Sequence, residues 1–292
     1  MKTPTLNEAW SAFNADFEQA LADVYADQTE PQQLLFDAMR YSLLAGGKRL
    51  RPFLVHLFCR ASSGAPELAR SAELAVEMVH TYSLIHDDLP AMDNDDYRRG
   101  KLTNHKVYGE AAAILAGDGL LTDAFRVLTT SGLRPDRINS CVDCLAVNAG
   151  PWGMVGGQVL DMLSERRELT EQEVRDIQTR KTGCLIKAAC CMGVICAGGS
   201  VEQLSAAMRY ADHVGLAFQI RDDVLDVVGD AKKLGKAVGV DGEKNTFVRL
   251  WGLPQCEALI HEQTEQAKEA LKVFAEPELL AELADRLAGR DA

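Results

Sequence analysis

The sequence predicts an all-α protein that forms one domain over residues 1–292. Apolar residues recur every three or four positions in segments such as 34–43, 74–82 and 214–228, a spacing that places them on one face of a helix. Alternating strand-like runs between turn dipeptides do not occur, and no linker or low-complexity stretch divides the chain. These patterns indicate a single domain of packed helices.

Prolines and glycine pairs indicate where the helices begin and end. Proline fits the first turn of a helix but not its interior, so Pro31 and Pro52 predict helix starts, and Pro135, Pro254 and Pro277 mark later boundaries. Glycine pairs at 46–47, 156–157 and 198–199 predict turns or close backbone contacts. The apolar stretch 188–199 is shorter than the ~20 residues of a membrane span, so it predicts a buried helix.

The composition argues against several classes of protein. Hydrophobic residues make up 47% of the chain and charged residues 25%, which is enough for a large core. The formal net charge of −12 disfavours a general nucleic-acid binder, because contacts to phosphates require a basic face. The N-terminus lacks the charged-then-apolar layout of a signal peptide, so a cytoplasmic protein is expected.

Eight cysteines lie mostly inside apolar helical segments. Cys141 and Cys144 form a C-x-x-C pair, but no second cysteine or histidine pair follows at the spacing of a zinc finger. We therefore expect core thiols in a reducing compartment.

Two clusters of aspartates, each followed by basic residues, are the most informative feature. The first contains Asp87, Asp88 and Asp93, and the second contains Asp222, Asp223 and Asp226. Like charges about 4 Å apart repel by roughly 1 kcal/mol even in water, so these clusters require solvent or bound cations. Oxygen ligands of this kind suit Mg²⁺, which bridges carboxylates to substrate phosphates. The sequence therefore predicts a magnesium-dependent enzyme that binds a diphosphate.

Helix geometry predicts how each cluster is arranged. Asp222 and Asp226 are four residues apart and share a helix face. Asp87 and Asp93 are six apart, but Pro90 interrupts the helix. We therefore expect the helix to end near Asp88 and a short loop to bring Asp93 back toward Asp87. An EF-hand is excluded, because loop position 6 counted from Asp93 is Arg98 instead of glycine.

A glycine turn followed by cations predicts an anion site. The segment runs Gly-Gly-Lys-Arg-Leu-Arg-Pro from 46 to 52, and backbone amides together with Lys48 and Arg51 suit a phosphate. It is not a Walker A loop, because Ser42 stands in place of the first glycine and Arg49 in place of Ser/Thr. His80, seven residues before Asp87, is placed to reach a second anion.

Together these segments resemble the short-chain trans-prenyl diphosphate synthases, specifically the bacterial farnesyl diphosphate synthases. The resemblance covers most of the chain and includes segments 46–54, 76–96, 98–101, 156–158, 181–183 and 215–226. It implies an isoprenoid synthase fold of antiparallel helices around a central cavity, with the acidic clusters facing each other across its mouth. It also implies a homodimer.

The resemblance assigns roles residue by residue. It implies about three Mg²⁺ ions, with Mn²⁺ as a substitute, held by Asp87, Asp88, Asp93, Asp222 and Asp226. The allylic diphosphate would be bound by Arg98, Lys181, Thr182, Gln219, Lys236 and Lys244. Isopentenyl diphosphate would be bound by Lys48, Arg51, His80 and Arg99. The catalytic residues would be Asp87, Asp93, Lys181, Thr182 and Gln219, of which Thr182 and Gln219 orient dipoles toward the allylic cation.

The implied reaction is a condensation of isopentenyl diphosphate with dimethylallyl or geranyl diphosphate. Magnesium would neutralise the departing diphosphate, and an apolar cavity would keep water from the cation. Tyr82 lies five residues before Asp87, ~7.5 Å along the helix, where it and Ser83 would limit the product to C15.

The alternatives are a C20 geranylgeranyl diphosphate synthase and, less favoured, a terpene cyclase. A cyclase would carry an Asn/Asp-Ser/Thr-Glu motif in place of the second cluster, and it would not need Lys48 and Arg51 for a second diphosphate. A non-catalytic synthase subunit would lack one or both acidic clusters, but both are complete here.

Overall fold

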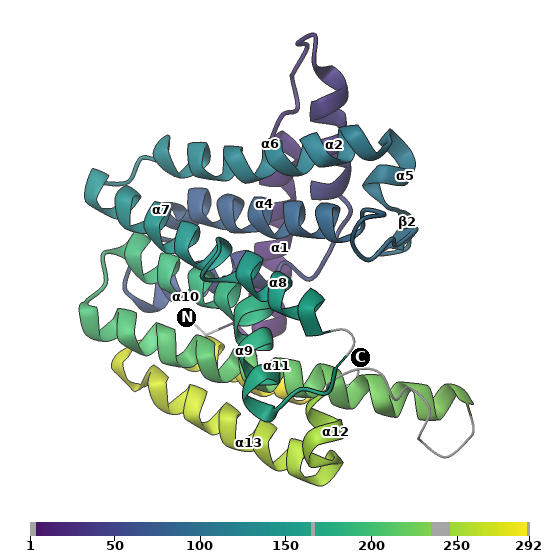
Figure 1. Ribbon diagram of the computed structural model, residues 1–292. Coiled ribbons are helices and arrows are strands. Elements are labelled where there is room, and N and C mark those ends of the chain that lie inside the picture. The colour runs from purple at the N-terminus through teal and green to yellow at the C-terminus, as the bar shows by residue number, and fades with distance from the viewer. Residues whose placement is uncertain (1–3, 165–166, 235–245, 291–292) are drawn as a thin grey trace.

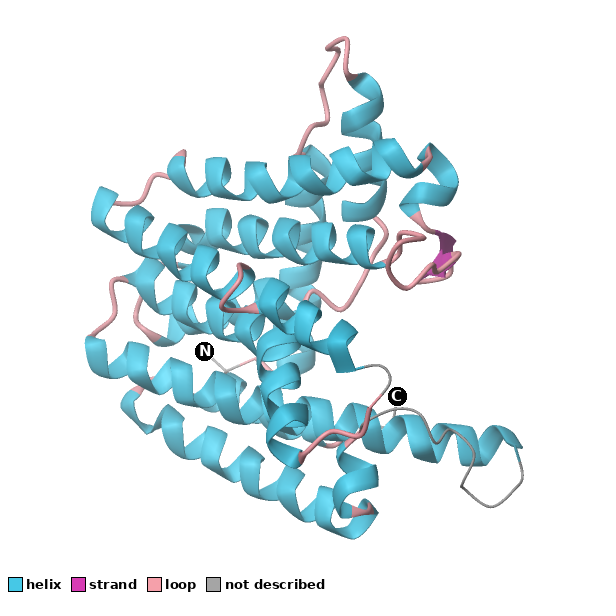
Figure 2. Ribbon diagram, viewed as in Figure 1, coloured by secondary structure: helices cyan, strands magenta, loops and turns pink. Residues whose placement is uncertain are grey.

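The computed structural model describes residues 4–164, 167–234 and 246–290, and helices account for nearly all of its regular structure (Figure 2). In chain order the elements are α1 (Leu6–Asp23), α2 (Gln33–Leu43), α3 (Leu50–Ala61), the 3₁₀ turn η1 (Pro66–Ala69), α4 (Arg70–Asp87), β1 (Tyr97–Arg98), β2 (Lys101–Leu102), α5 (Asn104–Tyr108), α6 (Glu110–Thr129), α7 (Pro135–Ala149), α8 (Met154–Ser164), α9 (Glu171–Gln178), the π-helix η2 (Thr179–Gly183), α10 (Cys184–Ala197), α11 (Val201–Leu234), α12 (Phe247–Trp251), α13 (Leu253–Ala270), the 3₁₀ turn η3 (Leu271–Val273) and α14 (Glu278–Ala288). The predicted all-α class is confirmed.

Helix α10 lies at the centre of the bundle. It packs against α3, α4, α7 and α11, and ten of its side chains or backbone positions from Leu185 to Cys196 are buried. In Figure 1, α6, α4, α11 and α13 lie one below the other in that order, and their axes all run across the view. The buried helix predicted from the apolar stretch 188–199 is therefore confirmed, and none of the described helices is both long and apolar enough to cross a membrane.

Local signals explain where several helices start and stop. Thr5 and Thr170 each form a capping box with a glutamate three residues later, at the starts of α1 and α9, which satisfies backbone amides that have no partner within the helix. Pro135 opens α7 as predicted. Gly198 ends α10 with a φ of 73°, a left-handed conformation that glycine adopts at little cost.

A short β-hairpin was not predicted from the sequence. Strands β1 and β2 pair antiparallel, with Arg98 opposite Lys101. The two residues between them, Arg99 and Gly100, have φ values of 53° and 76°, which a type I′ turn requires. The hairpin was missed because only one of these turn residues is glycine and the strands are two residues long. It holds Arg98 and Arg99 directly after the first acidic cluster.

The helices bury two apolar clusters. The larger one joins side chains from most of the helices, α13 and α14 included, but none from α9. The smaller one joins α9, α11, α12 and α13, with Ile220, Val224 and Phe247 among its buried members. Six of the eight cysteines are buried and the other two are partly buried, as core thiols should be.

The contact between α10 and α3 leaves no room for a side chain at Gly193. A Cβ atom there would lie 2.4 Å from the carbonyl oxygen of Val55 and 2.7 Å from Cβ of Phe58. We expect Gly193→Ala to lower the free energy of unfolding by about 1–3 kcal/mol, because the helices must separate. Thermal denaturation measures this loss as a fall in Tm. Gly132→Ala, where a Cβ would meet nothing within 4 Å, is the control, and equal Tm values for the two variants would contradict this packing argument.

Candidate active site

The first acidic cluster lies where α4 ends. Asp87 is the last residue of α4, and Asp88 forms its C-cap. The backbone amide of Asp93 donates a hydrogen bond to the carbonyl of Asp87 at 2.8 Å, and that of Asn94 donates to the carbonyl of Leu89 at 3.1 Å. These bonds close the loop around Pro90 and bring Asp93 back to the helix end. The geometry predicted from Pro90 is confirmed.

The negative charge of the Asp87 carboxylate is not fully balanced by neighbouring cations. Burial raises its pKa to about 6, Lys181 opposes that shift, and the neighbouring Asp93 adds to it. The C-terminal end of a helix also disfavours a negative charge. A bound cation would relieve all of these costs at once.

Asp88 is held differently from Asp87 and Asp93. It is buried, and its Oδ1 accepts hydrogen bonds from Nε of Arg98 at 2.7 Å and from Nη2 of Arg98 at 2.6 Å. Burial raises the pKa of Asp88, and the Arg98 bonds oppose the rise. Arg98, expected at the allylic diphosphate, is thus fixed by Asp88, and the role of Asp88 as a metal ligand stays a prediction.

The second acidic cluster lies on α11 as predicted. Asp222 is partly buried and Asp226 is exposed. The Asp222 carboxylate accepts a hydrogen bond from Nη2 of Arg290, whose guanidinium lies 3.8 Å above the Phe218 ring. Burial raises the pKa of Asp222, while Arg290 opposes the rise. Asp223 is buried and accepts a hydrogen bond from the amide of Phe247 at 2.7 Å, so it anchors the start of α12.

These donors fit magnesium that is shared with a substrate. In the part of the chain that the structure describes, no three His, Cys, Asp or Glu side chains form a group that could hold a metal by themselves. Mg²⁺ usually takes one or two carboxylates and fills its other positions with water and substrate phosphate. Asp87 with Asp93, and Asp222 with Asp226, would each supply such a pair of hard oxygen ligands.

A basic cavity lies next to the second acidic cluster, because Arg290 in its lining contacts Asp222. Its volume is about 1170 Å³, and it is lined by α1, the glycine turn, α4, Arg99, Phe218 and the C-terminal residues 285–290. All four residues predicted for isopentenyl diphosphate line it: Lys48, Arg51, His80 and Arg99. Arg286 and Arg290 add two further cations. The structure therefore brings these four together from three separate segments of the chain.

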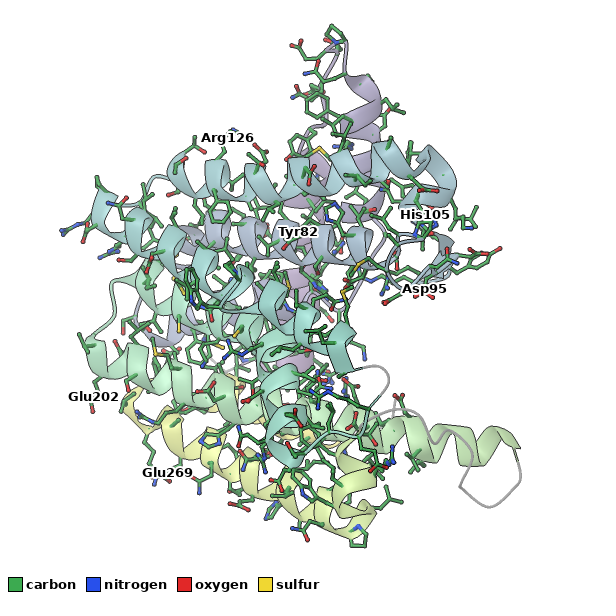
Figure 3. The ribbon with its side chains drawn as sticks, viewed as in Figure 1. Tyr82, Asp95, His105, Arg126, Glu202 and Glu269 are labelled. Carbon is green, nitrogen blue, oxygen red and sulfur yellow. The ribbon has the colours of Figure 1, made fainter. Side chains whose placement is uncertain are left out.

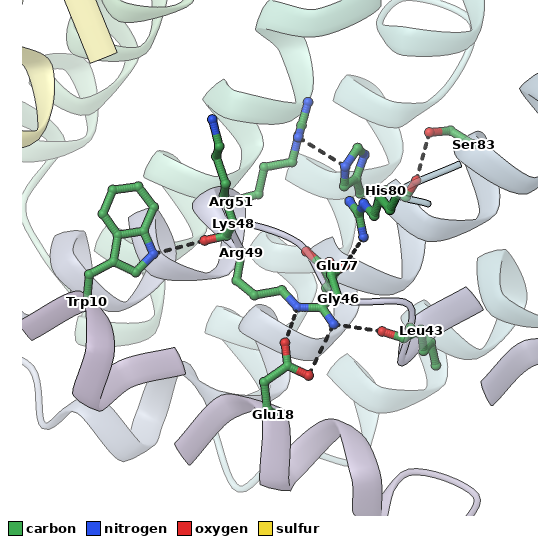
Figure 4. Close-up of polar contacts among 11 residues, drawn as sticks. Trp10, Glu18, Leu43, Gly46, Lys48, Arg49, Arg51, Glu77, His80 and Ser83 are labelled. Carbon is green, nitrogen blue, oxygen red and sulfur yellow. Dashed lines mark hydrogen bonds and ion pairs between the residues drawn. The ribbon is translucent and has the colours of Figure 1, made fainter. Parts of the chain in front are cut away.

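His80 acts as a neutral hydrogen-bond acceptor in this cavity. Burial and the nearby Arg51 hold the pKa of His80 well below its ordinary value, so its ring carries a single proton. Nη1 of Arg51 lies 3.3 Å from Nε2 of His80 (Figure 4), and an arginine can only donate. The proton of His80 is thus assigned to Nδ1, and His80 orients Arg51.

Lys181 and Thr182 lie in the π-helix η2. A Cβ at Gly157 of α8 would lie 2.3 Å from the backbone nitrogen of Lys181, and a Cβ at Gly215 of α11 would lie 3.5 Å from Cα of Gly183. The absence of side chains at these glycines allows both helices to touch η2. Gln219 lies one helical turn after Gly215, on the helix that packs against η2, and the roles of Thr182 and Gln219 stay predictions. Nζ of Lys181 also forms an ion pair with Asp161 of α8 at 2.5 Å.

The two residues predicted to control product length lie on the last turns of α4. Tyr82 is buried inside the bundle, whereas Asp95 lies at its edge (Figure 3), and the Tyr82 ring meets His86 edge-on with the ring centroids 5.7 Å apart. The hydroxyl of Ser83 donates to the carbonyl of His80 at 2.9 Å. Lys236 and Lys244 lie outside the described residues.

Sequence reasoning missed the partners that hold the predicted residues. They are Glu18, Arg49, Glu77, Asp161 and Arg290. Asp161 lies one helical turn after Gly157, so the spacing from the glycine pair could have suggested it. Arg49 stands inside the glycine turn that the sequence analysis singled out, whereas Glu18, Glu77 and Arg290 come from other segments and carry no local signal.

Comparison with known proteins identifies the family. The polyprenyl synthetase family model matches residues 32–286. The chain is 42% identical to the farnesyl diphosphate synthase of Bacillus subtilis over 96% of this chain and 98% of the relative. It is 44% identical to the geranylgeranyl diphosphate synthase of Cyanophora paradoxa over 82% of each.

A solved structure of an FPP/GFPP synthase from Zymomonas mobilis superimposes with a TM-score of 0.88 at 34% identity, covering 97% of this chain and 98% of that one. The chain belongs to the polyprenyl synthetase family. It is therefore a prenyltransferase of the isoprenoid synthase fold, and magnesium dependence is a property of its family.

The raised pKa of Asp87 predicts a pH-dependent stability effect. Folding raises this pKa to about 6 from an unfolded value near 3.9, so the folded protein favours the protonated form. Ionised Asp87 therefore costs stability above pH 6, and the cost fades as the pH falls toward 4. Without magnesium, we expect the free energy of unfolding of Asp87→Asn to exceed that of the wild type by on the order of 1 kcal/mol at pH 8. The difference should be smaller at pH 5.

Thermal denaturation at the two pH values measures this difference. Asp143→Asn, at an exposed position of α7, is the control and should match the wild type at both. A gain in the stability of Asp87→Asn that is larger at pH 5 than at pH 8 would contradict the raised pKa of Asp87.

Proposed function

We propose that this protein is a farnesyl diphosphate synthase. It would condense isopentenyl diphosphate with dimethylallyl and geranyl diphosphate to give the C15 product. One observation carries this proposal: Lys48, Arg51, His80 and Arg99 line one cavity beside carboxylates that need cations. Such a site offers two different surroundings for two diphosphates, one basic and one completed by metal. The family match and the named relatives support the same reaction.

The allylic diphosphate is assigned to the acidic side. Asp87, Asp93, Asp222 and Asp226, with Asp88 behind them, would hold about three Mg²⁺ ions, for which Mn²⁺ would substitute. When bound, these ions stabilise negative charge on the departing diphosphate. Arg98, Lys181, Lys236 and Lys244 would bind its oxygens. Because Arg98 is fixed by two bonds to Asp88, it can present its remaining donors without reorganisation.

Isopentenyl diphosphate is assigned to the basic cavity. Lys48, Arg51, His80 and Arg99 would hold its diphosphate and place its C3–C4 double bond against C1 of the allylic chain. The C4–C1 bond forms as the allylic C–O bond breaks, and a proton then leaves C2 for the released diphosphate. Thr182 of η2 and Gln219 of α11, two elements that pack together, would direct their dipoles at the transient cation.

Product length is assigned to Tyr82 and Ser83. Both precede Asp87 on α4, so a chain that grows down the helix from the acidic cluster meets them within about two turns. The bulk of Tyr82 supports a C15 product, and a C20 geranylgeranyl diphosphate synthase is the second candidate. No observation in the structure favours a terpene cyclase, which needs only one diphosphate site.

We also propose that the protein is a cytoplasmic homodimer. Large apolar side chains are exposed on the neighbouring helices α6, α7 and α8, including Ile114, Leu115, Val147, Val159 and Leu163. Exposed apolar groups that gather on adjacent elements are typical of a subunit interface. A second copy of the chain would cover them and leave each cavity open on its own subunit.

The first test is a product assay. Purified protein with Mg²⁺, isopentenyl diphosphate and geranyl diphosphate should yield a C15 alcohol after phosphatase treatment. Asp87→Ala should lower turnover by a factor of about 10³ or more with an unchanged circular dichroism spectrum.

Tyr82→Ala should shift the products toward C20. A hydrocarbon product would favour a cyclase instead. A C20 product from the wild type would keep the condensation but overturn both the C15 product and the role of Tyr82.

The second test is the mass in solution. Light scattering should give about twice the chain mass of 31.9 kDa. Leu115 is 58% exposed on α6. Leu115→Glu should reduce the mass to that of a single chain, because it puts a charge in the interface. Val201 is 86% exposed at the start of α11, away from the proposed interface. The control variant Val201→Glu should therefore stay dimeric. A wild type of single-chain mass would reject the dimer.

A further inference from the structure

The turn that carries Lys48 has an unusual backbone. Gly46, Gly47 and Arg49 have φ values of 83°, 142° and 52°. Glycine adopts such angles freely, but a left-handed arginine costs of order 1 kcal/mol or more. Arg49 is also the N-cap of α3, and its carbonyl accepts the amide hydrogen of Phe53 at 3.1 Å. Something in the surrounding structure must hold Arg49 in this conformation.

Two carboxylates and a carbonyl hold the Arg49 side chain, which is fully buried. Its Nε lies 2.7 Å from Glu18 of α1, its Nη1 lies 2.5 Å from Glu77 of α4, and its Nη2 donates to Glu18 at 3.2 Å and to the carbonyl of Leu43 at 2.8 Å (Figure 4). The guanidinium thus ties α1, α4 and the end of α2 to one point. Only the planar fork of an arginine can satisfy three such acceptors in fixed directions.

The left-handed residue directs its neighbours away from itself. In Figure 4 Arg49 runs toward Glu18, whereas Lys48 and Arg51 extend in the opposite direction, where they line the cavity. Further bonds hold the turn: Trp10 donates its indole hydrogen to the carbonyl of Lys48 at 2.9 Å, and Arg99 donates to the carbonyl of Gly46. The backbone on both sides of Arg49 is therefore fixed before any ligand arrives.

We propose that Arg49 is a positioning residue: bound to Glu18 and Glu77, it sets the turn that aims Lys48 and Arg51 at the second diphosphate, without touching either substrate. This inference rests on the proposed function, which places isopentenyl diphosphate in the basic cavity. Arg49 belongs to the cavity wall, but its side chain is fully buried and its guanidinium is already occupied by Glu18, Glu77 and the Leu43 carbonyl, so it adds no direct contact of its own. Its effect on substrate binding acts through Lys48 and Arg51.

Glu77 extends this arrangement to the rest of the cavity. It is buried next to Arg49, and its charge favours the protonated forms of both Arg51 and Arg99. Burial nevertheless lowers the pKa of Arg51 to about 10, which still leaves it charged at neutral pH. Without Glu77, three arginines would repel one another around the cavity. Glu77 is therefore the shared counter-charge that allows them to gather before the diphosphate binds.

The test separates binding of the two substrates. Arg49→Lys keeps the charge but cannot bridge Glu18, Glu77 and the Leu43 carbonyl together. We expect its KM for isopentenyl diphosphate to rise roughly tenfold, because displaced cations bind the diphosphate less well. Its KM for geranyl diphosphate and its kcat should stay within about twofold of the wild type. Calorimetric titration of isopentenyl diphosphate without magnesium should show the same weakening of Kd.

Arg40→Lys is the matched control. Arg40 also donates to backbone carbonyls, those of Ala22 and Val24, but it does not line the cavity. We expect this variant to lower Tm without changing either KM. If Arg49→Lys does not fold, Glu18→Gln weakens the same support while the Arg49–Glu77 pair stays intact, and its KM for isopentenyl diphosphate should still rise selectively.

The possible failures are distinguishable. An unchanged KM for isopentenyl diphosphate in a folded variant, or an equal rise in both KM values, would overturn the role of Arg49 alone. A wild type that neither elongates geranyl diphosphate nor binds isopentenyl diphosphate would overturn the proposed function as well. A selective rise that Arg40→Lys does not share would support both.

Discussion

Charge balance among partly buried ionic groups is the constraint on which the centre of this protein depends. Asp88 is balanced by Arg98, Asp222 by Arg290, and Glu77 by Arg49. The last two pairs tie together segments that are far apart in sequence. A buried charge that lost its partner would cost several kcal/mol. Asp87 is the informative exception, because burial and Asp93 outweigh the effect of Lys181 on its pKa. The carboxylate whose charge the protein's own cations do not balance is the one where the chemistry calls for a metal.

Close backbone contacts determine where the two side chains proposed as catalytic dipoles, Thr182 and Gln219, are attached. Gly157 lets α8 reach the backbone of Lys181, and Gly215 lets α11 reach Gly183. The π-helix between these contacts places Lys181 and Thr182 out of the regular helical register, which is a frequent feature of functional segments. The position of Thr182 relative to Gln219 is therefore set by packing against rigid helices, so it does not depend on a loop.

Local patterns predicted much of the site, and long-range contacts explain what they missed. The pairing of Asp222 with Asp226 follows from helix periodicity, and the return of Asp93 follows from Pro90, so both were found. The Glu18–Arg49 and Arg290–Asp222 pairs join residues 31 and 68 positions apart, and no pattern in the sequence encodes such contacts. The hairpin was missed because a left-handed Arg99 has no compositional signal. The gathering of Lys48, Arg51, His80 and Arg99 came from the family resemblance, since their spacing alone does not imply it.

The first helix, α1, belongs to the binding cavity, so truncating or recombining this enzyme near its N-terminus changes the cavity itself. The family model covers residues 32–286, yet Trp10 and Glu18 of α1 brace the glycine turn, and Asn7, Ser11 and Asn14 form part of the cavity wall. At the other end, Arg290 lies beyond the matched region and contacts Asp222. A chimaera cut at the limits of the family model would exchange the walls of the pocket together with its flanks. Swaps between relatives should therefore move α1, the glycine turn and the last turn of α14 as one cassette.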